Sequence, residues 1–156
     1  MRGLWVTGCV AALAAGALPV HGADGAAVFS QNCLMCHQSG GTGLPGQFPR
    51  LAGRVTHIAS KPKGRSYLIE LLNYGMTGKI TVDGQELIGL MPPFAQLSDE
   101  EVAAALNYVS ALGDQPRRAY APFTPEEIKA GRAKPPKSAA EVHADRKALG
   151  LDKLVP

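Results

Sequence analysis

Apolar residues recur at helical spacing in three stretches of the chain. The first stretch follows Asp24, a residue type that caps helix N-termini, and the last follows Ser98, which forms the pattern of a capping box with Glu101. Gly113 then predicts the end of the last helix. The apolar faces of the three predicted helices consist of Gly25, Phe29 and Cys33, of Tyr67, Leu68, Leu71 and Leu72 within residues 66–74, and of Val102, Ala105, Leu106, Val109 and Leu112.

The segment between the second and third predicted helices has a different pattern. Residues 81–85 contain an Asp-Gly pair, which predicts a tight turn with short extended pieces on either side. The other connections carry no periodic pattern. We therefore expect an all-α domain in which three main helices are joined by long loops.

The first 23 residues have the features of an export signal. A short basic start, Met1-Arg2, precedes an apolar run over residues 4–20, and small residues then lead to Asp24. We expect cleavage near residue 23, export to the periplasm and loss of Cys9 with the leader. The apolar run, about 17 residues long, is also just sufficient to span a bilayer, so an uncleaved membrane anchor is the alternative.

The remaining chain divides by composition into residues 24–113, which are rich in glycine and apolar side chains, and a polar, proline-punctuated extension, residues 114–156. Two short helices are predicted in the extension, with caps at Thr124 and Ser138. The extension has three interpretations: it wraps over the domain, docks on a partner protein or remains solvated. The net charge of +3 gives no support to a nucleic-acid partner.

Cys33-Leu34-Met35-Cys36-His37 is a C-x-x-C-H pentapeptide, the pattern of a covalent haem attachment site. The two thiols add to the vinyl groups of a haem, and the imidazole that follows becomes an axial ligand of the iron. A redox C-x-x-C would require a βαβ context, and a zinc site would require a second Cys or His pair, whereas only Cys9 remains. The motif therefore predicts one haem c, bound through Cys33 and Cys36, with His37 as an iron ligand.

Met91 is the strongest candidate for the second axial ligand. It precedes Pro92-Pro93 in a predicted loop, and the two prolines stiffen this loop, so that the thioether loses little entropy when it binds iron. The weaker candidates are Met76, which follows a glycine, His57 in a loop and His143 in the extension. Met35 lies inside the attachment motif and cannot reach over the haem ring.

Residues 24–113 resemble a class I c-type cytochrome, of the kind that bacteria export to the periplasm with a single haem. The resemblance implies that Gly25 allows the first and last helices to cross closely, while Phe29 and Tyr108 fill the junction. The features that carry it are Gly25 and Phe29 ahead of the C-x-x-C-H motif, the segment 49–53, the Met91-Pro92 pair and Tyr108 in the last helix.

The resemblance also assigns residues to the surroundings of the haem. It implies that the carbonyl of Pro49 accepts a hydrogen bond from His37 and so orients the imidazole. The one tryptophan, Trp5, lies in the leader, so the indole that contacts a haem propionate in many relatives is missing. The candidates for that contact are Arg50, Arg54 and Tyr67.

The resemblance implies an electron carrier and not an enzyme. With His37 and Met91 both on the iron, no position is open to a substrate, so we expect outer-sphere transfer of single electrons between redox partner proteins. The expected partners are a dehydrogenase as donor and an oxidase or another cytochrome as acceptor, with Gly40–Gly46 and Gly89–Phe94 as an uncharged docking rim. The alternatives are a fixed electron-relay subunit of a larger dehydrogenase or oxidase complex, and a haem sensor or peroxidase with an open site.

Overall fold

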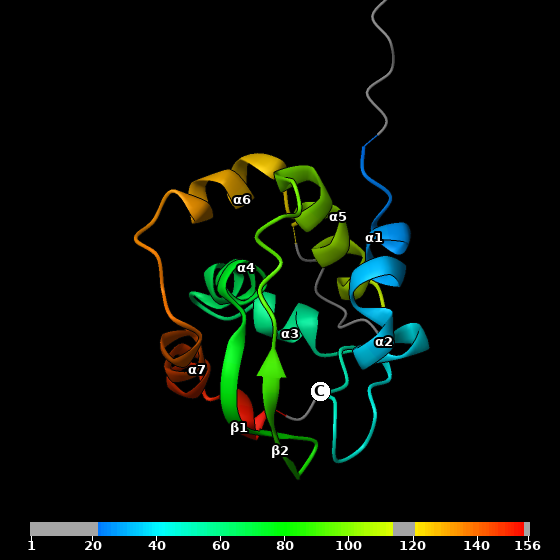
Figure 1. The fold of residues 1–156 in the computed structure, drawn as a ribbon, viewed down its shortest axis with the longest axis vertical. Helices are drawn as coiled ribbons and strands as arrows, with labels where there is room; N and C mark the ends of the chain where they lie inside the picture. Colours follow the sequence, from blue (N-terminus) through cyan, green and yellow to red (C-terminus); the bar gives the residue numbers. More distant parts are fainter. Residues whose placement is uncertain (1–21, 114–120, 155–156) are drawn as a thin grey trace, which may run out of the picture.

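The computed structural model describes residues 22–113 and 121–154 (Figure 1). Cys9, Trp5 and all of the predicted leader except its last two residues lie outside this range. None of the described helices has the length and apolar composition needed to cross a membrane. The described elements are the α-helices α1 (Gly25–Asn32), α2 (Leu34–His37), α3 (Val55–Ala59), α4 (Gly64–Tyr74), α5 (Asp99–Ser110), α6 (Pro125–Arg132) and α7 (Ala139–Ala148), the 3₁₀ helices η1 (Ser39–Gly41) and η2 (Leu151–Lys153), and the strands β1 (Met76–Val82) and β2 (Gln85–Met91).

The predicted helix caps are present. The Asp24 carboxylate accepts hydrogen bonds from the amides of Ala26 and Ala27 in the first turn of α1, and Ser98 and Glu101 form the expected capping box at the start of α5. Helix α4 begins at Gly64, two residues before the predicted start. The three main helices predicted from the pattern therefore exist, and the structure adds the shorter helices α2 and α3 to them.

Helices α1 and α5 cross closely at Gly25 (Figure 1). A Cβ atom built at this position would lie 2.3 Å from the carbonyl oxygen of Ala104, so only glycine fits without moving a helix. Phe29 and Tyr108 pack beside the crossing, with ring centroids 5.3 Å apart and ring planes inclined by 46°. Both packing roles implied by the resemblance are confirmed.

A two-stranded antiparallel hairpin corrects the all-α prediction. Its strands are seven residues each, longer than the short extended pieces expected, and the ladder runs from the turn to the pair Met76 and Met91. The turn residues Asp83 and Gly84 have φ values of 52° and 79°, the positive angles that a tight hairpin turn of this kind requires. The β-branched residues of β1 favour the extended conformation. The domain is thus mostly helical with one small hairpin.

The C-terminal extension packs against the rest of the chain. Helix α6 contacts α4 and α5, and helix α7 contacts α4 and β1 (Figure 1). Ile128, Val142 and Leu151 have no solvent-exposed surface. The predicted caps at Thr124 and Ser138 are confirmed. Of the three interpretations of the extension, the structure shows the one in which it wraps over the domain.

Helix α7 and η2 also cover the outer edge of β1. Nε2 of His143 lies 2.6 Å from the carbonyl oxygen of Lys79, and Arg146 donates a hydrogen bond of 3.1 Å to the carbonyl of Thr81. The Thr81 amide in turn donates to the Asp152 carboxylate over 3.1 Å. Since a free strand edge leaves backbone donors and acceptors unpaired, these side chains supply partners for three of the groups at the outer edge of β1.

Candidate haem site

The C-x-x-C-H motif lies where α1 gives way to α2. The backbone bends at Cys33, with φ of −120° and ψ of −30°, and the His37 amide donates to the Cys33 carbonyl over 2.9 Å. Cys33 and Cys36 therefore lie one helical turn apart, and both are half-buried free thiols. Burial, with a smaller contribution from Cys36, raises the pKa of the Cys33 thiol to about 11. Such an apolar setting suits the uncharged sulfur of a thioether.

His37 is buried and held in one orientation. The residue is only 7% exposed. Its Nδ1 lies 2.9 Å from the carbonyl oxygen of Pro49, which confirms the hydrogen bond implied by the resemblance. Burial lowers the pKa of His37, while the hydrogen bond to Pro49 acts in the opposite direction. Because Nδ1–H donates to Pro49, the lone pair of the neutral ring is on Nε2, where it can bind a metal.

The segment that carries Pro49 is held beside the motif by a glycine. The amide of Gly43 donates to the carbonyl of His37 over 2.8 Å. Gly43 has a φ of 70°, and a Cβ atom there would lie 2.6 Å from the carbonyl oxygen of Phe48. Both the backbone conformation and the close approach therefore require glycine at this position.

Met91 is the last residue of β2, whereas the sequence placed it in a loop. The side chain is half-buried and stands opposite Met76 in the ladder. Gly75, at the end of α4, comes so close that a Cβ atom there would lie 2.4 Å from the carbonyl oxygen of Met91. The position of Met91 is therefore determined by the hairpin and by α4, in addition to the stiffness of Pro92-Pro93.

Met76, the weaker candidate, shares one face of the hairpin with Met91, because residues directly opposite in an antiparallel ladder point to the same side. Met76 is 9% exposed, and the hydroxyl of Tyr67 lies 3.7 Å from its Sδ. Tyr67, which the sequence assigned to the haem surroundings, is itself buried. Met35, by contrast, is 86% exposed. The structure thus brings two thioethers and the tyrosine to one face of the hairpin.

Arg50 and Arg54 both bind Asp83 at the tip of the hairpin. Nε of Arg50 lies 2.9 Å from Oδ2 of Asp83, and Nη1 of Arg54 lies 2.8 Å from Oδ1. The hydrogen bond from Arg50, together with the charges of both guanidiniums, holds the pKa of Asp83 below its ordinary value. The sequence analysis named both arginines as candidates for a haem contact, but it identified Asp83 only as a turn residue. The two arginines lie 33 and 29 positions away from Asp83, so no local pattern in the sequence indicates that they bind it.

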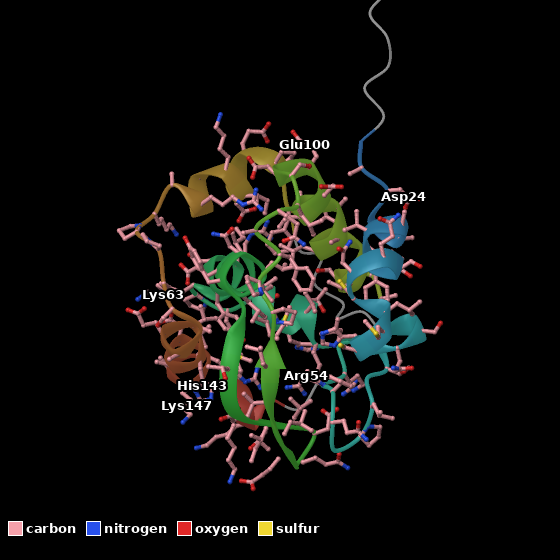
Figure 2. The ribbon with its side chains drawn as sticks, in the orientation of Figure 1. Asp24, Arg54, Lys63, Glu100, His143 and Lys147 are labelled. Carbon is pink, nitrogen blue, oxygen red and sulfur yellow. The ribbon has the colours of Figure 1, made fainter. Side chains whose placement is uncertain are left out.

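A hollow separates the segment that carries Pro49 from the hairpin. The amide of Gly46 donates to Oε1 of Gln85 over 2.9 Å and joins the two walls at one point. In Figure 2, Arg54 and His143 lie on either side of the hairpin. His57, the other histidine candidate, lies on α3. The lining of the hollow consists of Thr42, Pro45, Gly46, Phe48, Arg50, Val82, Asp83, Gln85 and Leu87.

The residues present fit a covalently bound haem c. Cys33 and Cys36 lie one turn apart in apolar surroundings, and the buried imidazole of His37 has Nδ1 bonded to a carbonyl and Nε2 available. Thioethers from the hairpin provide the soft, neutral ligand type that haem iron accepts in electron carriers. This combination defines a c-type haem protein.

The chain belongs to the cytochrome c family, which it matches over residues 22–113. It is 48% identical over 144 residues to a cytochrome c-552 of Thermus thermophilus, an alignment that covers 91% of this chain and 96% of that protein. A second Thermus thermophilus cytochrome c-552 is 50% identical over 131 residues, which cover 83% of this chain and 98% of that protein. The fructose dehydrogenase cytochrome subunit of Gluconobacter japonicus is 37% identical over 93 residues, which are 55% of this chain and 18% of that subunit. The protein is therefore a monohaem cytochrome c with covalent haem c, and an electron carrier rather than an enzyme.

Proposed function

We propose that the protein carries single electrons between redox partner proteins outside the cytoplasm, through one haem attached to Cys33 and Cys36 with His37 and Met91 as axial ligands. The observation that supports this most directly is the 2.9 Å contact between Nδ1 of His37 and the carbonyl oxygen of Pro49. It commits one ring nitrogen of a buried imidazole and leaves the other for iron.

The chain's own residues account for the choice of reaction. Bound haem supplies a one-electron Fe(II)/Fe(III) couple. His37 and Met91 would both bind the iron, so that no ligand position would remain for a substrate. A thioether ligand and apolar burial both disfavour the ferric charge, so this ligand pair gives a higher potential than two histidines would.

An uncharged surface supports brief docking on partner proteins. Met35, in the attachment motif, and Ile88 and Leu90, on β2, are 86%, 79% and 67% exposed. Leu44, in the Gly40–Gly46 loop, is 39% exposed. Single apolar side chains at a surface need no explanation, but Leu44 and Leu90 each lie in one of the two segments of the expected rim, and Ile88 directly precedes the second segment. A rim of this kind fits short-lived contacts with a dehydrogenase donor and an oxidase or cytochrome acceptor.

A fixed electron-relay subunit is the second candidate. The likeness to the fructose dehydrogenase cytochrome subunit supports it. The two cytochrome c-552 proteins, which this chain covers almost end to end, support the free carrier. Purification from the native host distinguishes them, since a fixed relay co-purifies with a dehydrogenase or oxidase in constant stoichiometry and a free carrier does not.

The optical spectrum of the exported protein tests the ligand assignment. After pyridine haemochrome analysis establishes one haem per chain, the ferric protein should show the weak red charge-transfer band of iron–methionine bonding. Met91→Ala should abolish this band, and the matched variant Met76→Ala, on the same face of the hairpin, should keep it. The reverse pattern would transfer the role to Met76. Binding of carbon monoxide to the native wild-type protein would instead indicate an open site and the sensor or peroxidase alternative.

A further inference from the structure

The two strands of the hairpin differ in what lies at their outer edges. At the edge of β1, side chains of α7 and η2 bond to the carbonyls of Lys79 and Thr81 and to the amide of Thr81. Strand β2 forms the other edge of the same two-stranded sheet. Figure 1 shows α7 beside β1, with β2 on the side of the hairpin away from α7. The extension therefore covers one edge of the sheet and not the other.

The ladder shows which backbone groups of β2 point outwards. Residues that stand opposite each other in an antiparallel ladder either both bond across it or both point away from it. Lys79 and Thr81 point away, since their backbone groups bond to α7 and η2. Their partners in the ladder, Ile88 and Glu86, therefore also point away, as does Leu90 two positions further along. Within the described part of the chain, nothing bonds to the outward amides and carbonyls of these three residues of β2.

The open edge of β2 has none of the usual protection against further pairing. Natural edge strands avoid pairing with other chains by means of proline, lysine, a bulge or a short length. Here the ladder runs over seven residue pairs without a bulge, and β2 contains neither proline nor lysine. Ile88 and Leu90 are instead apolar and largely exposed to solvent. The edge therefore has the features of a strand that accepts a further strand.

The Gly40–Gly46 loop approaches β2 at the end of the strand next to the turn. The amide of Gly46 donates to Oε1 of Gln85, the first residue of β2. From residue 86 onwards, the described residues of the loop form no hydrogen bond with the strand. Ile88, in the middle of β2, is 79% exposed. The loop thus leaves the middle of the open edge accessible.

A second copy of β2 matches this edge. If two copies run antiparallel about a two-fold axis at Ile88, then Ile88 faces Ile88 of the second copy, and Glu86 faces Leu90. The outward amides and carbonyls of both copies then bond across the new ladder. The Glu86 carboxylate is already paired with Lys79 of its own hairpin, and the two Glu86 side chains do not face each other. The pairing therefore joins apolar side chains without bringing like charges together.

We propose that the open edge of β2 is a self-association site, at which two copies of this chain pair their β2 strands antiparallel into a sheet of four strands. Pairing along residues 86–90 covers less than the about 1,200 Å² of a stable complex, so the dimer is weak. We expect a dissociation constant between about 0.1 and 1 mM.

The dimer has a consequence for electron transfer. Met91 lies three residues beyond Ile88, so the paired strands place the two Met91 residues about 20 Å apart. The two haem sites then lie along one continuous sheet, and exchange of electrons between the two copies is expected. This consequence rests on the proposed function, whereas the association of the strands does not.

Sedimentation equilibrium and amide NMR spectra of the reduced holoprotein, recorded from about 0.05 to 2 mM, test the association. The amide signals of Glu86, Ile88 and Leu90 should shift with protein concentration. The same amides should exchange with deuterated water more slowly in the concentrated sample, because they become hydrogen-bonded in the dimer.

Two substitutions of Ile88 separate strand pairing from a simple contact between side chains. Ile88→Pro removes the outward amide but no bond of the existing ladder, and proline is tolerated at such an edge position. Ile88→Val keeps the amide and a β-branched apolar side chain. We expect Ile88→Pro to weaken the association at least about tenfold and Ile88→Val to leave it within about twofold of the wild type. Equal association of the two variants would overturn the strand pairing.

Ile88→Lys provides a second test should Ile88→Pro fail to fold. The exposed side chain can be replaced without disturbing the core, and two ammonium groups then face each other across the axis, which should weaken the association about tenfold. The control is Ala144→Lys, which adds the same charge at an exposed position of α7, beside the covered edge. Ala144→Lys should associate like the wild type, and equal association of the two lysine variants would overturn the proposal.

A wild-type protein that stays monomeric up to about 2 mM would overturn the proposal and would leave the edge of β2 to a strand of another protein. A dimer whose concentration-dependent signals lie away from β2 would overturn it equally. The haem content and the red charge-transfer band are recorded for each sample, so that a failure of the proposed haem site is seen separately from a failure of the association.

Discussion

The backbone amide of Phe94 donates a 2.7 Å hydrogen bond to the carbonyl of Leu72 in α4. Pro92 and Pro93 have no N–H, so Phe94 is the first residue after Met91 that can make such a bond. Strand β2 holds Met91 from one side and this bond holds the chain from the other. The candidate ligand thus lies on a short segment with both ends attached to ordered structure.

Gly75→Ala should disturb this attachment more than Gly84→Ala, a substitution at another glycine with a positive φ. Gly75 has φ of 69°, and a Cβ atom would lie 2.4 Å from the carbonyl oxygen of Met91, whereas Gly84 has φ of 79° and open space around it. We expect Gly84→Ala to cost about 1 kcal/mol from backbone strain alone. Gly75→Ala should cost about 2 kcal/mol more and weaken the red charge-transfer band, as measured by denaturant unfolding and optical spectra. Equal effects of the two variants would show that the close approach to Met91 is unimportant.

Gly25→Ala should force α1 and α5 apart. The added methyl group would lie 2.3 Å from the carbonyl oxygen of Ala104. To relieve this clash, α1 and α5 must move apart, and the packed rings of Phe29 and Tyr108 must move with them. We expect a loss of about 3 kcal/mol in the free energy of unfolding. Gly89→Ala, on β2 with no atom within 4 Å of the new methyl group, should change it by less than about 0.5 kcal/mol. A small effect at Gly25 would mean that the helices have room to separate.

Asp83→Asn should reduce the sensitivity of stability to acid. The pKa of Asp83 is lowered in the folded protein, first by its hydrogen bond from Arg50 and further by Arg54. A lowered folded pKa gives stability that is present above the unfolded pKa of an aspartate, about 3.9, and is lost as the pH falls through the folded pKa. The wild type should therefore lose more stability than Asp83→Asn between pH 6 and pH 3, while at pH 6 the variant is less stable by about 1 kcal/mol.

The control for this prediction is Glu86→Gln. Glu86 pairs with Lys79 on the surface, with side chains 63% and 55% exposed, and exposed pairs contribute little. We expect a change below about 0.5 kcal/mol at pH 6 in urea unfolding. If Asp83→Asn retained the full acid sensitivity of the wild type, the contacts of Arg50 and Arg54 with Asp83 would not be a source of it.

Leu151→Ala should destabilise the whole protein and not the extension alone. Leu151 is completely buried where η2 meets β1, so its truncation leaves a cavity in the shared core. We expect a loss of about 2–4 kcal/mol in a single cooperative transition. Lys147→Ala, exposed on α7 (Figure 2), should change stability by less than about 0.5 kcal/mol. Two separate transitions would show instead that the extension unfolds independently of the haem domain.

Local signals in the sequence were sufficient for the helices and for the attachment motif. The caps at Asp24, Ser98 and Ser138 depend on side chains that bond amides two or three residues away, so each is visible in a short window. The hairpin was only partly visible, because the Asp-Gly turn is local but the seven-residue pairing depends on the cover that α7 and η2 provide. The end of β2 at Met91 was missed for the same reason.

By itself, the sequence determined the covalent chemistry of this protein: two thiols and an imidazole within five positions specify haem c, because attachment and ligation require no distant residue. Only the tertiary structure decided what surrounds that chemistry. The packing of residues 121–154 over the domain, the joint hold of Arg50 and Arg54 on Asp83, and the hydrogen bond from Arg146 to Thr81 all join residues that are far apart in the sequence. Such contacts form only when the whole chain buries its apolar surface, so no periodicity or motif within one segment records them.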